Sequence, residues 1–112
     1  MEPLIIEIQT DDRTLSMPFD GGTKRGTEVL PGVVYDGLVI RKGGDILSDA
    51  LRFIVDVSVG LEVNLLAAYL YDKVRSRADT RLVIRRRVVE QTTRDGIERV
   101  IEEEIRGPYN KD

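Results

Sequence analysis

Five aspartates in the first half of the chain could serve in acid–base catalysis: Asp11, Asp12, Asp20, Asp45 and Asp49. Such chemistry needs carboxylates held in a cleft with shifted pKa values. Each of these aspartates lies where a turn or a helix cap would favour an acid. Neither histidine nor cysteine is present to accompany them. We therefore predict a non-enzymatic protein without a catalytic set.

The absence of cysteine and histidine excludes several further kinds of site. Disulfide bonds, a thiol nucleophile, a serine–histidine dyad and zinc sites of the usual ligands all need one of these residues. We therefore predict no metal and no cofactor. A chain without cysteine fits the cytoplasm, and the opening MEPLIIEIQTDDR lacks the basic start and long apolar core of a signal peptide.

Two glycine-rich segments could cradle a phosphate group. The first, residues 20–28 (DGGTKRGTE), contains Lys24 and Arg25 but lacks the spacing of a P-loop and does not open a helix. The second, residues 41–45 (RKGGD), leads into a helix N-terminus, but Asp45 would repel an anion there. Neither segment predicts a phosphate site.

A run of basic residues follows the most apolar part of the chain. Its members are Lys73, Arg75, Arg77 and Arg81, extended by Arg85, Arg86 and Arg87. The run could contact nucleic acid, so a nucleic-acid-binding regulatory protein is our alternative prediction of function. Against it stand the net charge of −3, the lack of interleaved aromatic residues for base stacking, and the glutamates farther along the chain.

Residues 81–105 (RLVIRRRVVEQTTRDGIERVIEEEI) have the composition of two β-strands around a turn at residues 93–96. Every charge then meets its opposite across the strands, and a slip by one residue breaks the match. We therefore predict a charged C-terminal hairpin in which arginines and glutamates neutralise each other. The predicted register sets Arg85, Arg86 and Arg87 opposite Glu104, Glu103 and Glu102.

Residues 45–77 carry apolar side chains at helical spacing, with Asp45 or Ser48 as the N-cap. A second interpretation stays open, because residues 53–59 also alternate as a strand would. Gly60 could then separate that strand from a shorter helix that begins at Glu62. Charged residues interrupt this apolar stretch, so we do not predict that it spans a membrane.

The chain is predicted to form a single α+β domain over residues 1–112, in the order β-β-α-β-β. One long helix covers one face of a mostly antiparallel sheet. Outside the helix and the hairpin, strands are expected at residues 3–10 and 32–42, with Gly37 as a bulge. The remaining parts are a glycine-rich loop region (residues 11–32, with room for a short strand at 14–19) and a tail (residues 106–112).

Without a catalytic, metal or cofactor site, the function that the sequence favours is a protein–protein contact. We predict a small interaction or adaptor domain, and a homodimer if the partner is a second copy. The helix has two apolar stripes, so a partner could cover the stripe that the sheet does not. The N-terminal strands could instead wrap around the helix and bury both stripes. The predicted interface is the hairpin edge or the helix face with Leu66, Tyr69, Leu70 and Tyr71.

Overall fold

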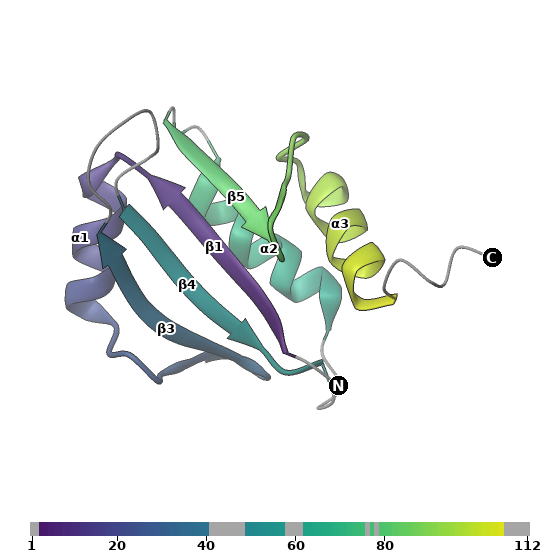
Figure 1. Cartoon of the computed structure of the whole chain (residues 1–112), viewed down its shortest axis with the longest axis horizontal. Coiled ribbons are helices and arrows are strands. Elements are labelled where there is room, and N and C mark those ends of the chain that lie inside the picture. Colours follow the sequence, from purple (N-terminus) through teal and green to yellow (C-terminus); the bar gives the residue numbers. More distant parts are fainter. Residues whose placement is uncertain (1–2, 41–48, 58–61, 76, 78, 107–112) are drawn as a thin grey trace.

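The structure, a computed structural model, describes residues 3–40, 49–57, 62–75, 77 and 79–106 (Figure 1). The strands are β1 (Leu4–Thr10), β2 (Glu28–Leu30), β3 (Val33–Ile40), β4 (Asp49–Val55), β5 (Thr80–Ile84) and β6 (Arg87–Val88). The helices are α1 (Arg13–Gly22), α2 (Val63–Val74) and α3 (Arg94–Arg106). The strands form one antiparallel sheet in the order β2-β3-β4-β1-β5-β6. The predicted α+β class is confirmed, whereas the order β-β-α-β-β and the single long helix are not.

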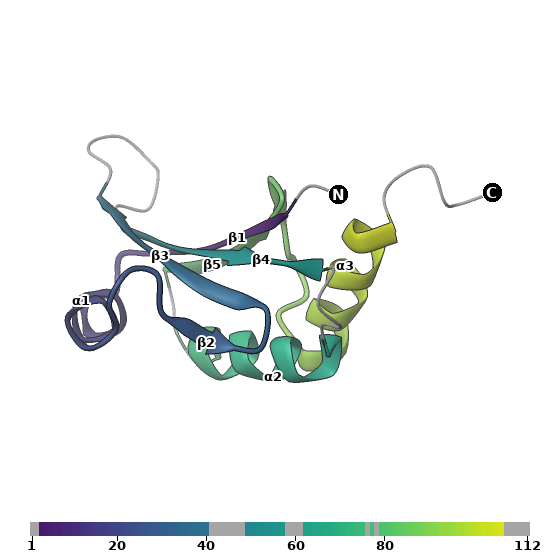
Figure 2. The same ribbon diagram turned by 90° about the horizontal axis from the view of Figure 1, so that it is seen from below.

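The helices lie on one side of the sheet (Figure 2). α2 lies beneath the strands, α3 packs against α2 beside the β5 edge of the sheet, and α1 lies near β3 and β4. No helix in the described part of the chain covers the opposite side, which faces the viewer in Figure 1. The sheet therefore has a covered face, which holds the core, and an uncovered face.

The central strands place alternate residues on these two faces. Along β1, Leu4, Ile6 and Ile8 are fully buried in the core, and the residues between them are only partly buried. β4 pairs antiparallel with β1 and alternates in the same way, so Phe53 lies in the core while Arg52 lies on the uncovered face. This is the usual pattern of antiparallel strands with one packed and one solvated face.

Residues 49–55 correct the predicted long helix. They form β4, which begins four residues before the strand of the second interpretation, and the helix that follows is the shorter α2, as that interpretation predicted. Pairing with β1 decides between the two interpretations, because as a strand the segment buries a leucine, a phenylalanine and a valine on one side. Gly60 and the predicted caps Asp45 and Ser48 lie outside the described residues, as do residues 107–112 of the predicted tail.

Residues 11–32, predicted as a glycine-rich loop, hold a helix and a short strand instead. Asp12 is the N-cap of α1, and its carboxylate accepts a hydrogen bond from the backbone N–H of Thr14 (2.9 Å). Leu15 and the partly buried Phe19, four residues apart, turn one face of α1 to the core. The helix stands where the short strand was predicted, and β2 follows it as an edge strand.

The predicted C-terminal hairpin is wrong in its second half. The short strand β6 pairs with β5 around a turn at Arg85 and Arg86, with Ile84 opposite Arg87. Residues 94–106 then form α3 rather than a strand, because their apolar side chains recur at helical spacing and reach the core. These buried residues are Ile97, Val100 and Ile101.

Two of the three arginines still meet glutamates, but those glutamates lie on α3 and not on a paired strand. Arg87 Nη1 lies 2.6 Å from Glu103 Oε1 and 3.7 Å from Glu104 Oε2. Arg85 Nε lies 3.8 Å from Glu104 Oε1. Mutual neutralisation is thus confirmed for Arg85 and Arg87, whereas Arg86 has no ion pair among the described residues.

Candidate interaction surface

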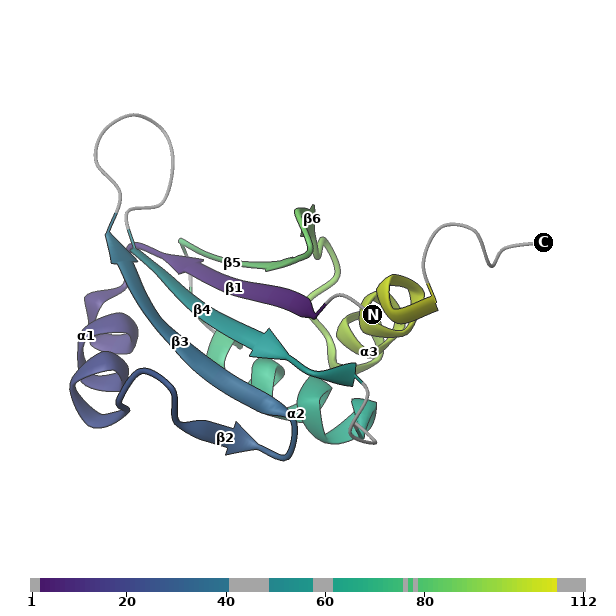
Figure 3. The same ribbon diagram turned by 60° about the horizontal axis from the view of Figure 1, so that its bottom comes forward.

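The uncovered face of the sheet is hollowed. A depression of about 550 Å³ lies across β1, β4 and β5 and reaches the β5–β6 turn, which stands above this face at one end (Figure 3). We call it the sheet hollow. It is lined by Ile5, Glu7, Gln9, Arg52, Arg81, Val83, Arg85, Arg86 and Val88. Four arginines and one glutamate make the hollow basic, although the whole chain has a net charge of −3.

Strand register places the side chains of the sheet hollow in rows across the sheet. Glu7 of β1 lies opposite Arg52 of β4 on one side and Val83 of β5 on the other. Two residues farther along β1, Gln9 lies opposite Arg81. Residues directly opposite each other are within side-chain reach, so these rows form one continuous surface.

Two of the four arginines of the sheet hollow, Arg52 and Arg85, have ion pairs, whereas Arg81 and Arg86 have none among the described residues. Glu7 Oε2 lies 3.6 Å from Arg52 Nε, and Glu7 Oε1 accepts a hydrogen bond from Gln9 Nε2 (2.9 Å). The Nε atoms of Arg52 and Arg81 are shielded from solvent and lack a hydrogen-bond acceptor in the described part of the chain. An anion entering the hollow could pair with the guanidinium groups of Arg81 and Arg86, which have no ion pair in the described part of the chain.

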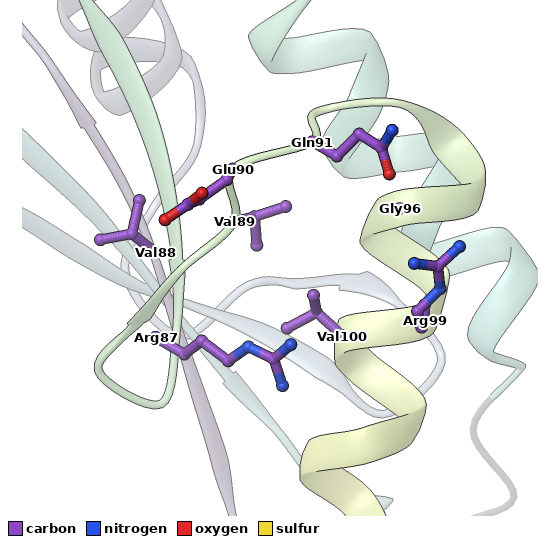
Figure 4. Close-up of a pocket in the computed structure, with 8 residues that line it drawn as sticks. All are labelled: Arg87, Val88, Val89, Glu90, Gln91, Gly96, Arg99 and Val100. Atoms are coloured by element: carbon purple, nitrogen blue, oxygen red, sulfur yellow. The ribbon is translucent and has the colours of Figure 1, made fainter.

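A second depression, of about 430 Å³, lies between α3 and the segment that contains β6 (Figure 4). We call it the strand–helix groove. It is lined by Arg87, Val88, Val89, Glu90, Gln91, Gly96, Arg99 and Val100. Val89 and Val100 point into it and are almost fully buried, whereas Arg99 is exposed. Val88 lines both depressions, so the two adjoin at β6.

The structure separates part of the predicted nucleic-acid-binding run, but Arg81 and the extension residues Arg85 and Arg86 lie together in the sheet hollow. Lys73 Nζ lies 5.4 Å from the centroid of the Phe19 ring, between α2 and α1. Arg75 lies over a tyrosine ring, and Arg77 is paired with an aspartate. Of these four predicted residues, Arg81 alone lines the sheet hollow. Arg52, which also lines the hollow, was not among the predicted site residues, because β4 was predicted as part of a helix.

Half of the predicted helix interface is not available on the folded chain. Leu66 and Leu70 are fully buried in the core, because α3 and the sheet together cover α2. The prediction that a partner contacts these two leucines therefore does not hold. Tyr69 and Tyr71 are partly buried. The Tyr69 ring lies 6.1 Å from that of Phe53, and burial raises the pKa of its hydroxyl to about 12.

The aromatic side chains gather on the covered side of the sheet, away from the sheet hollow. Phe19, Tyr35, Phe53 and Tyr69 form a chain of ring contacts with centroids 5.0 to 6.1 Å apart. The Tyr35 hydroxyl donates a hydrogen bond to Asp20 Oδ1 (2.7 Å). Burial, and then this hydrogen bond, raise the pKa of Tyr35. No aromatic residue lines the sheet hollow.

The predicted candidates for acid–base catalysis have structural contacts. Asp49 is fully buried and accepts a hydrogen bond from the Ser16 hydroxyl (2.6 Å), which ties α1 to β4. Asp12 caps α1, and the backbone N–H of Asp11 donates to the carbonyl of Asp79. Asp45 and its glycine-rich segment lie outside the described residues. Within the described residues, no group of three acidic side chains is placed to hold a metal ion.

Comparison with protein families, with curated proteins and with solved structures gave no match for this chain. In the described part of the chain, none of the helices has the length and apolar character needed to cross a membrane. The case for a function therefore rests on the chemistry of the surface itself.

Asp12 links α1 to the segment after α2, and this link should make the stability of the fold depend on pH. Hydrogen bonds from Thr14, and then from Arg77, hold the pKa of Asp12 below its ordinary value, and burial opposes them in part. Arg77 Nη1 lies 2.7 Å from Asp12 Oδ2. A carboxyl group whose pKa is lower in the folded chain stabilises the fold above its unfolded-state pKa. That contribution is lost as the pH falls through the folded-state pKa.

We therefore expect Asp12→Asn to lower the urea midpoint at neutral pH, with an effect that shrinks as the pH falls below about 4. Asparagine is also a good N-cap, so the substitution removes the charge more than the cap. Urea unfolding followed by circular dichroism over a series of pH values measures this. Asp72→Asn, on an exposed position of α2, is the matched control and should change little. An Asp12→Asn effect of equal size at every pH would contradict the role of the ionised carboxylate.

Proposed function

We propose that the chain is a non-enzymatic interaction or adaptor domain of the cytoplasm that binds an acidic segment of a partner protein in the sheet hollow. The observation that carries this proposal is charge. Four arginines line the hollow with a single glutamate, on a chain that is negative overall. Guanidinium groups bind carboxylates with two parallel hydrogen bonds, which gives both strength and direction. The absence of cysteine from the chain supports the cytoplasmic location.

The apolar side chains of the hollow favour a protein segment over nucleic acid. Ile5, Val83 and Val88 lie among the arginines, and Val88 is 41% exposed. An extended segment that alternates acidic and aliphatic residues could contact both kinds of side chain. Single-stranded nucleic acid is usually held by aromatic rings that stack on its bases, and the hollow has none.

A second copy of this chain is a poorer partner for the hollow. Two hollows facing each other would place arginines against arginines, and like charges across an interface are unfavourable. A homodimer would therefore have to use a different surface, such as the partly exposed side of α2 that includes Tyr71.

The test is a binding titration with a short fluorescein-labelled peptide in which glutamates alternate with leucines, followed by fluorescence anisotropy. We expect the wild-type chain to bind it, and Arg52→Gln with Arg81→Gln to bind about tenfold more weakly. Binding should also weaken as salt is added. The matched control is Arg25→Gln with Arg94→Gln, which removes the same charge from exposed positions outside the hollow and should bind like the wild type.

Two further ligands separate the alternatives. The same peptide with glutamine in place of glutamate should not bind, because it keeps the apolar contacts without the charge. Oligothymidine of equal charge tests the alternative function, in which Arg81 and the other arginines of the hollow contact nucleic acid. Tighter binding of oligothymidine than of the acidic peptide would replace our proposal with that alternative. If the wild type binds neither ligand, the proposal fails.

A further inference from the structure

The turn between β5 and β6 has an unusual composition for its conformation. Ile84 pairs with Arg87, so the turn consists of two residues, Arg85 and Arg86. Their φ angles are 48° and 69°, which is the signature of a type I′ hairpin turn. Asparagine and glycine are the residues that this turn favours, because other side chains are strained in the left-handed region. Two arginines in succession are therefore costly for the fold.

The described contacts of the turn are few: the Arg85 backbone N–H donates a hydrogen bond to the carbonyl of Ile5 (2.9 Å), and this bond needs no arginine side chain. Arg85 has one ion pair, in which its Nε lies 3.8 Å from Glu104 Oε1, and its side chain is 40% exposed. Exposed pairs of this kind contribute little to stability. Arg86 is exposed and has no ion pair in the described part of the chain. Strained backbone that stability does not explain is typical of functional sites.

Both side chains line the sheet hollow, at the end where the turn stands above the uncovered face (Figure 3). Arg85 and Arg86 therefore lie at the rim of the hollow, while Arg52 of β4 and Arg81 of β5 lie on the sheet itself. Their place at the rim means that a ligand entering the hollow from solvent can meet them without any change in the core.

We propose that the Arg85–Arg86 turn is the anion-binding rim of the sheet hollow, and that its guanidinium groups bind carboxylates of the acidic segment. Arg86, which has no internal partner among the described residues, makes the first contact. Arg85 then exchanges Glu104 for a carboxylate of the ligand, so α3 supplies the counter-charge when the hollow is empty. This inference rests on the proposed function and adds the residues that capture the ligand.

The test compares substitutions that separate strain from charge. Arg85→Asn with Arg86→Gly gives the turn its preferred residues, so the melting temperature should rise by roughly 5 °C. The same double substitution should weaken binding of the glutamate–leucine peptide about tenfold. Arg86→Ala removes one charge but keeps the strain, so it should weaken binding without raising the melting temperature. Arg86→Lys should retain part of the affinity, because it keeps the charge but not the planar geometry.

Failure of this inference can be told apart from failure of the proposed function. If the wild-type chain does not bind the peptide, the proposed function fails and the inference fails with it. If Arg52→Gln with Arg81→Gln weakens binding, but neither Arg86→Ala nor the double substitution Arg85→Asn with Arg86→Gly does, the hollow remains the binding site and the role of the rim is overturned. A fall in melting temperature on placing Asn–Gly in the turn would also overturn it, because the arginines would then serve the fold.

Discussion

Leu70→Asp is expected to leave the chain unfolded. Leu70 lies on α2 with no exposed surface, inside the core beneath the sheet. Loss of a buried leucine side chain alone is unfavourable by about 2–5 kcal/mol. A buried carboxylate without a partner adds several kcal/mol more. Small domains are stable by about 5–15 kcal/mol in total, and a chain of 112 residues has a modest core. The sum therefore matches or exceeds the stability available.

Far-UV circular dichroism and a urea titration measure the outcome, and Leu65→Asp is the matched control. Leu65 lies on the same helix but is 46% exposed, so its replacement should change the stability by no more than about 0.5 kcal/mol. The sequence pattern by itself predicts a different result for Leu70→Asp, namely a folded monomer that has lost a dimer contact. If that is what is found, Leu70 lies at an interface and the packing of α2 described above is wrong.

The parts of the fold that the sequence predicted are those where local pattern and tertiary structure agree. The isoleucine-rich residues 3–10 were predicted as a strand and form β1. Residues 32–42 were predicted as a strand with a bulge at Gly37, and they contain β3. The ladder shifts between Tyr35 and Leu38, and Gly37 has a φ of 100°, so the bulge is confirmed.

The segment around β4 could not be assigned to a strand or a helix from its local pattern. Its apolar residues fit a helical stripe and a strand alternation about equally well, since a short run of apolar residues matches both periods. What decides is a partner: Leu51 lies opposite Ile8 and Phe53 lies opposite Ile6 in the ladder with β1. No local property of the segment encodes that pairing. Because the strand was not predicted there, the position of Arg52 in the candidate site could not be predicted either.

The prediction of a C-terminal hairpin was wrong for a different reason. The arginines and the glutamates can form ion pairs equally well between two strands or between a β-turn and a helix packed against it. The charge pattern therefore could not choose between them. A signal that could have chosen was present in the apolar residues: Ile97, Val100 and Ile101 are three and four residues apart, which is the spacing of one helix face.

Gly96→Ala is the second substitution for which we expect a large effect, because α3 and the segment after β6 touch at this glycine. A Cβ atom at Gly96 would clash with the backbone oxygen of Gln91 and would lie 3.1 Å from the side-chain oxygen of Thr93. The first contact is with backbone, so relief requires the whole segment to move. The Gly96 N–H also donates to Thr93 Oγ1 (3.0 Å), and that bond would be strained as well.

Overpacking of this kind is unfavourable by about 1–3 kcal/mol, which outweighs the roughly 1 kcal/mol that alanine gains over glycine in a helix. We therefore expect Gly96→Ala to lower the melting temperature by several degrees and to open the strand–helix groove. Gly21→Ala is the matched control, because a Cβ atom at Gly21 in α1 has no neighbour within 4 Å. This substitution should raise the melting temperature slightly. If Gly96→Ala melts no lower than the wild type, α3 does not lie this close to the segment after β6, and the groove is not a fixed feature of the surface.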